Sequence, residues 1–284
     1  MRNFTFKGLF LTAVFMLLGC LSIQAANDDL ITKQITIKLD KAGTLPDRIA
    51  SSKKYKITNL KLVGEINGTD WNMIREMAGR NYQESSTEGN LSVLDLSEAK
   101  IVAGGDYYYY DNLFNNKVYT SNDEIGEYAF AYCSGLTSLT LPVGITSIGE
   151  FAFSGCSGLT SLTLPAGITS IGEFAFSYCS GLTSIYVYAE KVPRIGRYAF
   201  EGCASRKCTL YVPKGTYDNY RLSEFGYFEN IVEFDATGID KTTTSTDVEE
   251  VSRYSVNGQR LAVPVKGLNI VKYSDGTVRK VVVK

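Results

Sequence analysis

The sequence predicts a mainly β protein of the α+β class: a solenoid of 23-residue coils with an α/β N-terminal cap and a small C-terminal β-module. A phrase of near-identical residues begins at Ile125, returns at Ile148 and returns in looser form at Ile171. One cysteine and one phenylalanine recur with it at steps of 23, 23 and 24 residues. A fixed period of this size indicates one coil per repeat, each burying its apolar face on the next. The two rows are Cys133, Cys156, Cys179 and Cys203, and Phe130, Phe153, Phe176 and Phe200.

Residues 1–25 have the pattern of a secretory signal peptide. Two basic residues come first, and residues 9–18 form an apolar run that is short for a bilayer span. Small residues follow, so we expect cleavage near Ala25. The residues around Cys20 also resemble a bacterial lipobox, in which this cysteine would carry a lipid anchor, and both alternatives stay open.

The composition disfavours nucleic-acid binding and catalysis. The net charge of −1 becomes −3 when the leader is removed with its two basic residues, and a chain so close to neutral lacks the basic surface that nucleic acid requires. The chain has no histidine, which excludes Ser-His-Asp and Cys-His catalysis and every histidine-liganded metal site. Since histidine performs most acid–base chemistry near neutral pH, an enzyme is disfavoured. No second apolar run could cross a membrane, and the pattern indicates no cofactor.

Residues 26–123 are expected to form the N-terminal cap. Thr44 and Thr69 are predicted to cap two short helices, the second with an apolar stripe that starts at Trp71 and a stop at Gly79. The Leu-x-x-Leu-x-Leu spacing of the regular coils also occurs here, so we interpret the region as irregular coils of the same solenoid. Strands are expected over residues 35–39, 57–66 and 91–101.

Residues 102–123 interrupt the period and are rich in Tyr, Asn, Asp and Gly, which predicts a long loop. Its four consecutive tyrosines resemble an antibody contact loop, because tyrosine offers rigid contact area beside adaptable polar neighbours. In the alternative, two or more of these side chains fold back over the first coils. They are Tyr107, Tyr108, Tyr109 and Tyr110.

Within each regular coil, the leucines are expected to point inward from a strand and the intervening threonines and serines outward. In the first coil the inward residues are Leu136, Leu139 and Leu141, and Pro142 ends the strand. Coils lie about 4.8 Å apart, so each position becomes a row of like side chains. The outward hydroxyl rows are candidates for contact with a glycan or protein, and the alternative is an ordinary solvated sheet face.

The cysteine row is interpreted as buried structural thiols, because stacked side chains run parallel and disfavour disulfides. A bridge between Cys203 and Cys208 stays open. A row of glutamates is interpreted as solvated carboxylates rather than a calcium site, because no Asp or Asn ligands surround it. These glutamates are Glu127, Glu150 and Glu173.

A second aromatic row lies two residues before each core phenylalanine, which places it half out of the core. Aromatic side chains exposed in register form a candidate ligand platform, and the alternative is a stack that only stabilises the coils. The altered last coil adds Tyr186 and Tyr188 as further candidate contacts. The row is Tyr128, Phe151, Phe174 and Tyr198.

The chain is expected to divide at the end of the repeats. Residues 124–235 are assigned to the regular coils and an aromatic C-terminal cap, and residues 236–250 to a polar linker. Residues 251–284 are expected to form the small β-module, with hairpin turns at Asn257-Gly258 and Asp275-Gly276.

The phrase Ile-Gly-Glu-x-Ala-Phe-x-x-Cys-Ser-Gly-Leu-Thr-Ser-Leu-x-Leu-Pro resembles the BspA-type leucine-rich repeat of many bacterial surface proteins, over residues 124–213. The N-terminal cap is similar to that of secreted members from anaerobic gut and oral bacteria. The tail resembles, in shorter form, the C-terminal sorting-type tails of the same bacteria. This resemblance implies a leucine-rich-repeat solenoid that is secreted or lies on the outer face of the outer membrane, and members are typically adhesins or binding proteins.

We therefore expect a non-catalytic extracellular protein that binds a host or microbial surface protein or glycan. The expected contacts are the four-tyrosine run, the second aromatic row and the Tyr186/Tyr188 region. The first alternative is a structural component of a cell-surface assembly, without a soluble ligand. A remote alternative is a carboxylate-dependent glycan hydrolase.

Overall fold

The computed structural model describes residues 30–112, 115–236, 250–255, 260–261, 267–273 and 278–283. These residues divide into two compact units, the first ending at Phe234 and the second beginning at Asp235. The expected signal peptide with Cys20, residues 237–249 of the expected linker and both expected hairpin turns lie outside the described residues. Within the described ranges, none of the helices has both the length and the apolar character that a membrane crossing requires.

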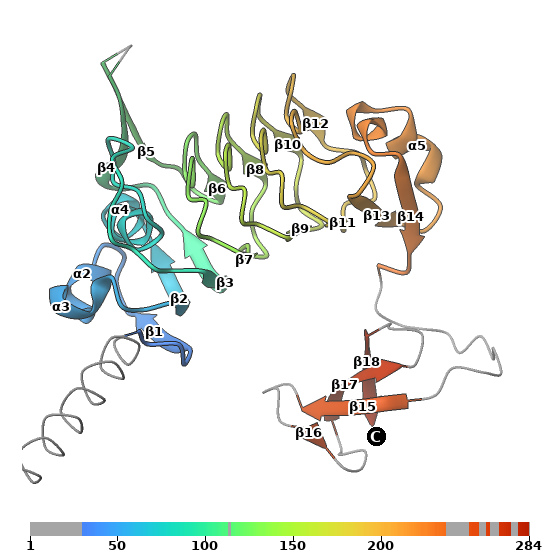
Figure 1. Ribbon diagram of the computed structural model, residues 1–284, viewed down its shortest axis with the longest axis horizontal. Helices are drawn as coiled ribbons and strands as arrows, with labels where there is room; N and C mark the ends of the chain where they lie inside the picture. The colour runs from blue at the N-terminus through green and yellow to red at the C-terminus, as the bar shows by residue number, and fades with distance from the viewer. Residues whose placement is uncertain are drawn as a thin grey trace, which may run out of the picture. The chain divides into compact units, whose positions relative to one another are not determined.

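An eight-stranded parallel sheet runs through the whole first unit (Figure 1). The three expected cap strands extend this sheet: β3 pairs with the first regular-coil strand, β2 pairs with β3, and β1 pairs with β2, an arrangement consistent with irregular coils of the same solenoid. In spatial order, the strands are β1 (Ile35–Leu39), β2 (Asn59–Ile66), β3 (Val93–Ile101), β7 (Ser138–Thr140), β9 (Ser161–Leu164), β11 (Ser184–Val187), β13 (Thr209–Pro213) and β14 (Asn230–Phe234).

A second, four-stranded parallel sheet is built from the returning limb of each coil. Each of its strands has two residues and pairs with the strand one coil away, so that Ser147 lies opposite Ser170. Every regular coil therefore contributes to both sheets, as a repeat solenoid requires. The strands are β6 (Glu124–Ile125), β8 (Ser147–Ile148), β10 (Ser170–Ile171) and β12 (Arg194–Ile195).

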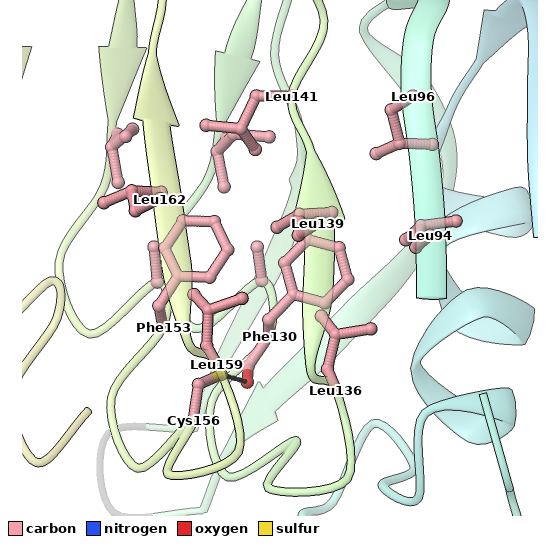
Figure 2. Close-up of a cluster of buried hydrophobic side chains, with 14 of the residues drawn as sticks. Leu94, Leu96, Phe130, Leu136, Leu139, Leu141, Phe153, Cys156, Leu159 and Leu162 are labelled. Atoms are coloured by element: carbon pink, nitrogen blue, oxygen red, sulfur yellow. Dashed lines mark hydrogen bonds between the residues drawn. The ribbon is translucent and has the colours of Figure 1, made fainter. Parts of the chain in front are cut away.

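The core lies between the two sheets (Figure 2). Its leucines point inward and the intervening hydroxyl residues outward, which confirms the predicted alternation: Leu136, Leu139 and Leu141 are buried, and Thr137 and Thr140 are exposed. The recurring core phenylalanines stack at ring-centroid distances of 5.0 to 5.5 Å, and we name this row the inner ladder. The inner ladder is Phe130, Phe153, Phe176 and Phe200.

The cysteines are buried thiols, as predicted, and the five described ones are unbridged, Cys203 and Cys208 included. Cys156 Sγ donates a hydrogen bond to Phe130 O at 3.1 Å, and the next two coils repeat this contact (Figure 2). Burial raises the pKa of the Cys156 thiol far above its usual value, so the thiol stays protonated and able to donate.

The N-terminal cap has three short helices, α2 (Leu45–Arg48), α3 (Ser51–Lys54) and α4 (Gly68–Met77). The predicted caps are wrong in one respect, because neither threonine side chain caps its helix. Asn67 is the N-cap of α4, and its amide oxygen accepts from Thr69 N at 3.1 Å. The buried Asp70 carboxylate accepts from Leu45 N at 2.8 Å, where Thr44 was expected to act, and also from the backbone N–H of residues 43 and 67.

The expected long loop is instead a β-hairpin, made of β4 (Gly104–Asp111) and β5 (Asn116–Thr120). The hairpin is fixed to α4 by three hydrogen bonds. Thr69 Oγ1 donates to Asp106 Oδ2 and accepts from Asp106 N, both at 3.0 Å, and Asn72 Nδ2 donates to Tyr107 O at 2.7 Å. The polar composition gave no sign of these strands. The tyrosines of β4 pack on the cap and not on a sheet face, so the segment lacks the alternation that predicts a strand.

The C-terminal cap consists of β13, β14, the helix α5 (Tyr217–Arg221) and the 3₁₀ helix η1 (Glu224–Tyr227). Phe225 and Phe228 are buried against Phe200, with ring centroids 5.4 and 5.1 Å away, and so close the end of the inner ladder. This agrees with the prediction of an aromatic C-terminal cap.

The second unit contains a four-stranded antiparallel sheet in the order β16, β15, β17, β18. The strands that flank the two expected turns do pair as hairpins, although the turn residues themselves are not described. Arg253 Nη1 donates to Asn269 Oδ1 at 3.2 Å in its interior. The strands are β15 (Glu250–Ser255), β16 (Arg260–Leu261), β17 (Gly267–Tyr273) and β18 (Val278–Val283).

Candidate functional site

The second aromatic row forms a continuous half-buried stack, which we name the outer ladder. Its rings lie 5.0 to 5.1 Å apart. Each residue has a positive φ of 51° to 57°, a left-handed conformation that is uncommon outside glycine. The ring faces cover one another, so most of the stack offers only ring edges to a ligand, in line with the stabilising alternative. The outer ladder is Tyr128, Phe151, Phe174 and Tyr198.

The left-handed corner is held by hydrogen bonds between coils. At each corner, backbone N–H groups of alternate residues donate to carbonyls of the next coil, as from Tyr128 N to Glu150 O at 2.9 Å and from Phe130 N to Ala152 O at 2.6 Å. A hydrogen bond that satisfies a partly buried backbone group stabilises the conformation that permits it. The carbonyls of the first coil therefore have no preceding coil to donate to them. The N–H groups of the last coil have no following coil to accept from them.

The N-terminal cap supplies side-chain donors to these carbonyls. Tyr108 Oη donates to Glu127 O at 2.8 Å, and Trp71 Nε1 donates to Ala129 O at 3.0 Å. The buried Arg75 guanidinium donates to Ala129 O as well, at 3.0 Å. These three side chains occupy the place of the missing preceding coil.

The four-tyrosine run divides into buried and half-exposed residues. Tyr108 and Tyr109 are 1% and 6% exposed, so their side chains are part of the cap and their assignment to an exposed contact surface is wrong. The pairing of β4 with β5 shifts register before Tyr109, and such a bulge turns consecutive side chains inward. Tyr109 stacks on Tyr128 at 4.2 Å and 9°, which covers the first ring of the outer ladder.

The remaining hairpin tyrosines and Tyr82, from the segment that follows α4, form an aromatic group that we name the hairpin cluster. Tyr107 is its centre, with Tyr82 and Tyr119 edge-on at 5.4 and 6.3 Å and Lys117 Nζ 4.7 Å above its ring. Sequence analysis identified two of the four members. The hairpin cluster is Tyr82, Tyr107, Tyr110 and Tyr119.

Tyr186 and Tyr188 meet two aromatic residues that sequence analysis missed. On the outward face of the large sheet, Tyr186 stacks on Tyr211 at 4.4 Å, and Phe234 stands edge-on to Tyr188 at 5.1 Å. These four residues are named the sheet-face cluster. The signal for Tyr211 was present, because Thr209–Pro213 repeats the alternation of the preceding strand and pairs Tyr211 with Tyr186.

The outward face of the sheet changes character along the solenoid. At its N-terminal part, Lys61 Nζ contacts Glu98 Oε1 at 2.6 Å and Asp95 Oδ2 at 3.3 Å. In the middle, threonine hydroxyls donate to carbonyls of the preceding coil, as from Thr183 Oγ1 to Thr160 O at 3.0 Å. These hydroxyl protons are therefore already used between coils, which favours the interpretation of an ordinary sheet face there.

A third aromatic row was missed by sequence analysis. Tyr132 and Tyr178 are exposed, and each ring lies across the glycine at the same position of the next coil. A Cβ on Gly155 would lie 2.8 Å from Tyr132 Cδ1, and one on Gly202 would lie 2.7 Å from Tyr178 Cδ1. The sequence signal is the alternation of Tyr and Gly before successive cysteines.

The glutamate row lies at the exposed corner beside the outer ladder. Partial burial and the nearby charges of Glu150 and Glu124 raise the pKa of the Glu127 carboxyl. Across the described part of the chain, no group of three or more Cys, Asp or Glu side chains is arranged to hold a metal ion.

Comparison with known proteins identifies a repeat family and structural similarity to a solved leucine-rich repeat protein. Residues 103–224 match the model of the BspA type leucine rich repeat region, in six copies. Among solved structures, the chain is similar to a leucine-rich repeat protein from Bacteroides ovatus ATCC 8483, with 22% sequence identity and a TM-score of 0.35. The match covers 73% of this chain and 44% of that chain, so it includes less than half of the relative's length. No curated protein matches the sequence.

Proposed function

The chain is a leucine-rich repeat protein of the BspA type, and from this premise we propose that it is a non-catalytic binding protein of the cell surface or extracellular space. Repeat scaffolds of this kind serve protein interaction through an extended surface. The proposed partner is a protein on a host or microbial surface, and a surface glycan is the second ligand class. The proposed location rests on the leader pattern of residues 1–25 and on the family.

The observation that carries this proposal is the sheet-face cluster. It joins four aromatic side chains on the outward face of two adjacent coils and the last strand, and the preceding coil has Thr163 opposite Tyr186. Tyrosines are enriched at protein interfaces, because they combine a large apolar area with a hydroxyl group and few rotatable bonds. The exposed Val232 extends the cluster along the same sheet row, next to Tyr211.

The test measures binding of the full chain to immobilised extracellular matrix proteins and to a glycan panel. The informative variant changes Tyr186, Tyr188 and Tyr211 to Ser. The matched control changes Tyr107, Tyr110 and Tyr119 of the hairpin cluster to Ser. We expect the first variant to lose at least about tenfold in affinity, with the thermal midpoint little changed, and the control to bind like the parent.

Equal affinity of the parent and the sheet-face variant would contradict the proposed contact. Loss in the control variant alone would move the contact to the hairpin cluster. Binding to no protein or glycan would favour the assembly component, whose own test is deletion of residues 251–284.

A further inference from the structure

The last coil ends in unused backbone donors. The preceding coil donates from three alternate N–H groups at its corner, but the N–H groups of Tyr198 and Phe200 have no hydrogen-bond partner among the described residues. These two N–H groups correspond to the donors of the preceding coil, but no further coil follows to supply carbonyl acceptors. The three preceding bonds run from Phe174 N to Arg197 O at 3.1 Å, Phe176 N to Ala199 O at 2.7 Å and Tyr178 N to Glu201 O at 2.6 Å.

The last ring of the outer ladder is also uncovered. Tyr198 stacks on Phe174 at 5.1 Å with one face, and no described aromatic side chain stacks on the other. It is 61% exposed, whereas the other three rings of the outer ladder are partly buried. The C-terminal cap covers Phe200 of the inner ladder and stops short of Tyr198.

A cavity of about 290 Å³ lies at this open position, and we name it the end pocket. Tyr198 and Phe200 line it from the last coil, and Glu224 and Tyr227 line it from the cap. Its remaining ionisable lining residue is Glu201, so the pocket has two carboxylates and no basic side chain in its wall. Neither carboxylate has a lysine or arginine partner among the described residues.

We infer that the end pocket docks an extended segment of a partner protein that carries an arginine. Two carbonyls of alternate residues in this segment accept hydrogen bonds from the N–H groups of Tyr198 and Phe200, as the next coil would. The arginine guanidinium stacks on the open face of Tyr198 and pairs with the carboxylates of Glu201 and Glu224. That the partner is a protein rests on the proposed function.

Arginine fits this position better than other side chains. A guanidinium is planar, stacks on an aromatic face and pairs with carboxylates through two parallel hydrogen bonds. A neutral aromatic side chain would cover Tyr198 equally well but would leave both carboxylates unpaired. An unpaired N–H edge is a common docking site for an added peptide strand, because main-chain hydrogen bonds supply the affinity.

The test uses the full chain and the capped pentapeptide acetyl-Gly-Arg-Ala-Ala-Gly-amide, followed by amide NMR and calorimetry. We expect a dissociation constant on the order of 1 mM, with shifted amide signals of Tyr198 and Phe200. The same peptide with citrulline, the neutral isostere of arginine, is expected to bind about tenfold more weakly. The Glu201→Gln, Glu224→Gln double variant is expected to remove that preference.

A matched pair of variants distinguishes the contribution of the Tyr198 ring to peptide binding from a general effect on the fold. Tyr198→Asn removes the ring while Asn still tolerates the left-handed backbone, and it should weaken peptide binding. Tyr178→Asn makes the same change at an equally exposed left-handed position outside the pocket, and it should bind like the parent.

Three results would overturn the inference: equal binding of the arginine and citrulline peptides, equal effects of Tyr198→Asn and Tyr178→Asn, and amide shifts that avoid Tyr198 and Phe200. Concentration-dependent dimers that compete with the peptide would instead assign the edge to a second copy of the chain. These results are independent of the sheet-face variants, so failure here leaves the proposed function to its own test.

Discussion

The two ends of the solenoid differ in which aromatic ladders their caps cover. At the N-terminal end, Trp71 packs on the inner ladder, Tyr109 covers the outer ladder, and three side chains donate to the carbonyls of the first coil. At the C-terminal end, Phe225 and Phe228 close the inner ladder, but the outer ladder and its N–H groups stay open. Stability requires the inner ladder to be closed at both ends, since it carries the core, and the open outer end is therefore available for binding.

The largest expected effect comes from breaking the closed end at Trp71. This side chain is 1% exposed, and its ring lies 5.2 Å from Phe130. Trp71→Ala is expected to reduce the free energy of unfolding by about 4 kcal/mol, measured by urea denaturation. Trp71→Phe keeps most of the packing but removes the donor to Ala129 O, so we expect about half that loss. Equal losses for both variants would show that the hydrogen bond and not the packing closes this end.

The two ends of the outer ladder should respond unequally to the same substitution. Tyr109→Ala removes a buried ring and its hydrogen bond to Glu84, and we expect a loss of about 3 kcal/mol in the free energy of unfolding. Tyr198→Ala removes an exposed ring and should cost less than about 1 kcal/mol. Similar midpoints of chemical denaturation for the two variants would contradict the difference between the ends.

Two glycine substitutions measure how much the contact with an exposed tyrosine ring contributes to the cost of adding a Cβ. Gly155→Ala adds a Cβ at a φ of 72° and pushes it against the Tyr132 ring, so we expect a loss of about 2 kcal/mol. Gly215→Ala makes the same change at a φ of 85° with no atom within 4 Å, and about 1 kcal/mol is expected. The double variant with Tyr132→Ala and Gly155→Ala lacks the clashing ring, so its thermal midpoint should match that of Gly215→Ala.

The smallest expected effect concerns the charged N-terminal part of the sheet face. Lys61→Gln should cost about 0.5 kcal/mol at neutral pH, as partly exposed ion pairs do. Burial opposes ionisation of Asp95, but hydrogen bonds to Ser97 and the Lys61 charge lower its pKa. The hydrogen bond to Glu98 raises the pKa of Lys61 despite some desolvation. Both shifts result from contacts that require the charged forms of the groups.

The sign of the pH dependence follows from those directions. The Asp95 contribution is complete above its unfolded pKa near 4 and is lost as the pH falls through the lower folded value. The Lys61 contribution is complete below its unfolded pKa near 10.4 and is lost as the pH rises through the higher folded value. Parent and Lys61→Gln should therefore differ most between about pH 5 and 9. A difference that persists at pH 2 would contradict an ionic origin.

The repeat period predicted which side chains of the regular coils are buried, but it did not predict the structure of the caps at the two ends. The inward leucines, the buried thiols and the half-buried aromatic row each followed from one residue type recurring at one step. The capping role of Asp70 did not, because the backbone N–H groups that donate to its carboxylate at the start of α2 lie 25 and 27 residues earlier, and nothing local marks them. The burial of Tyr108 and Tyr109 depends on a bulge and on the packing of the hairpin on α4, which composition does not record.

The candidate contacts show the same limit. Tyr186 and Tyr188 could be singled out because they break the repeat, but their partner Phe234 lies in a strand that follows a helix and has no repeat of its own. The end pocket could not be predicted from the aromatic row alone, since Tyr198 looks like any other member until the cap that follows it is placed.

The Tyr–Gly alternation sets how this protein can lengthen. Tyr132 and Tyr178 each lie across a glycine, so two successive coils differ and the structurally equivalent unit is a pair of coils. Duplication of a single coil would place two tyrosines or two glycines side by side. Duplication of a pair preserves every contact along this surface and moves the two ends apart by about two ring spacings of 5.0 Å. Related chains of different length should therefore gain or lose regular coils in even numbers.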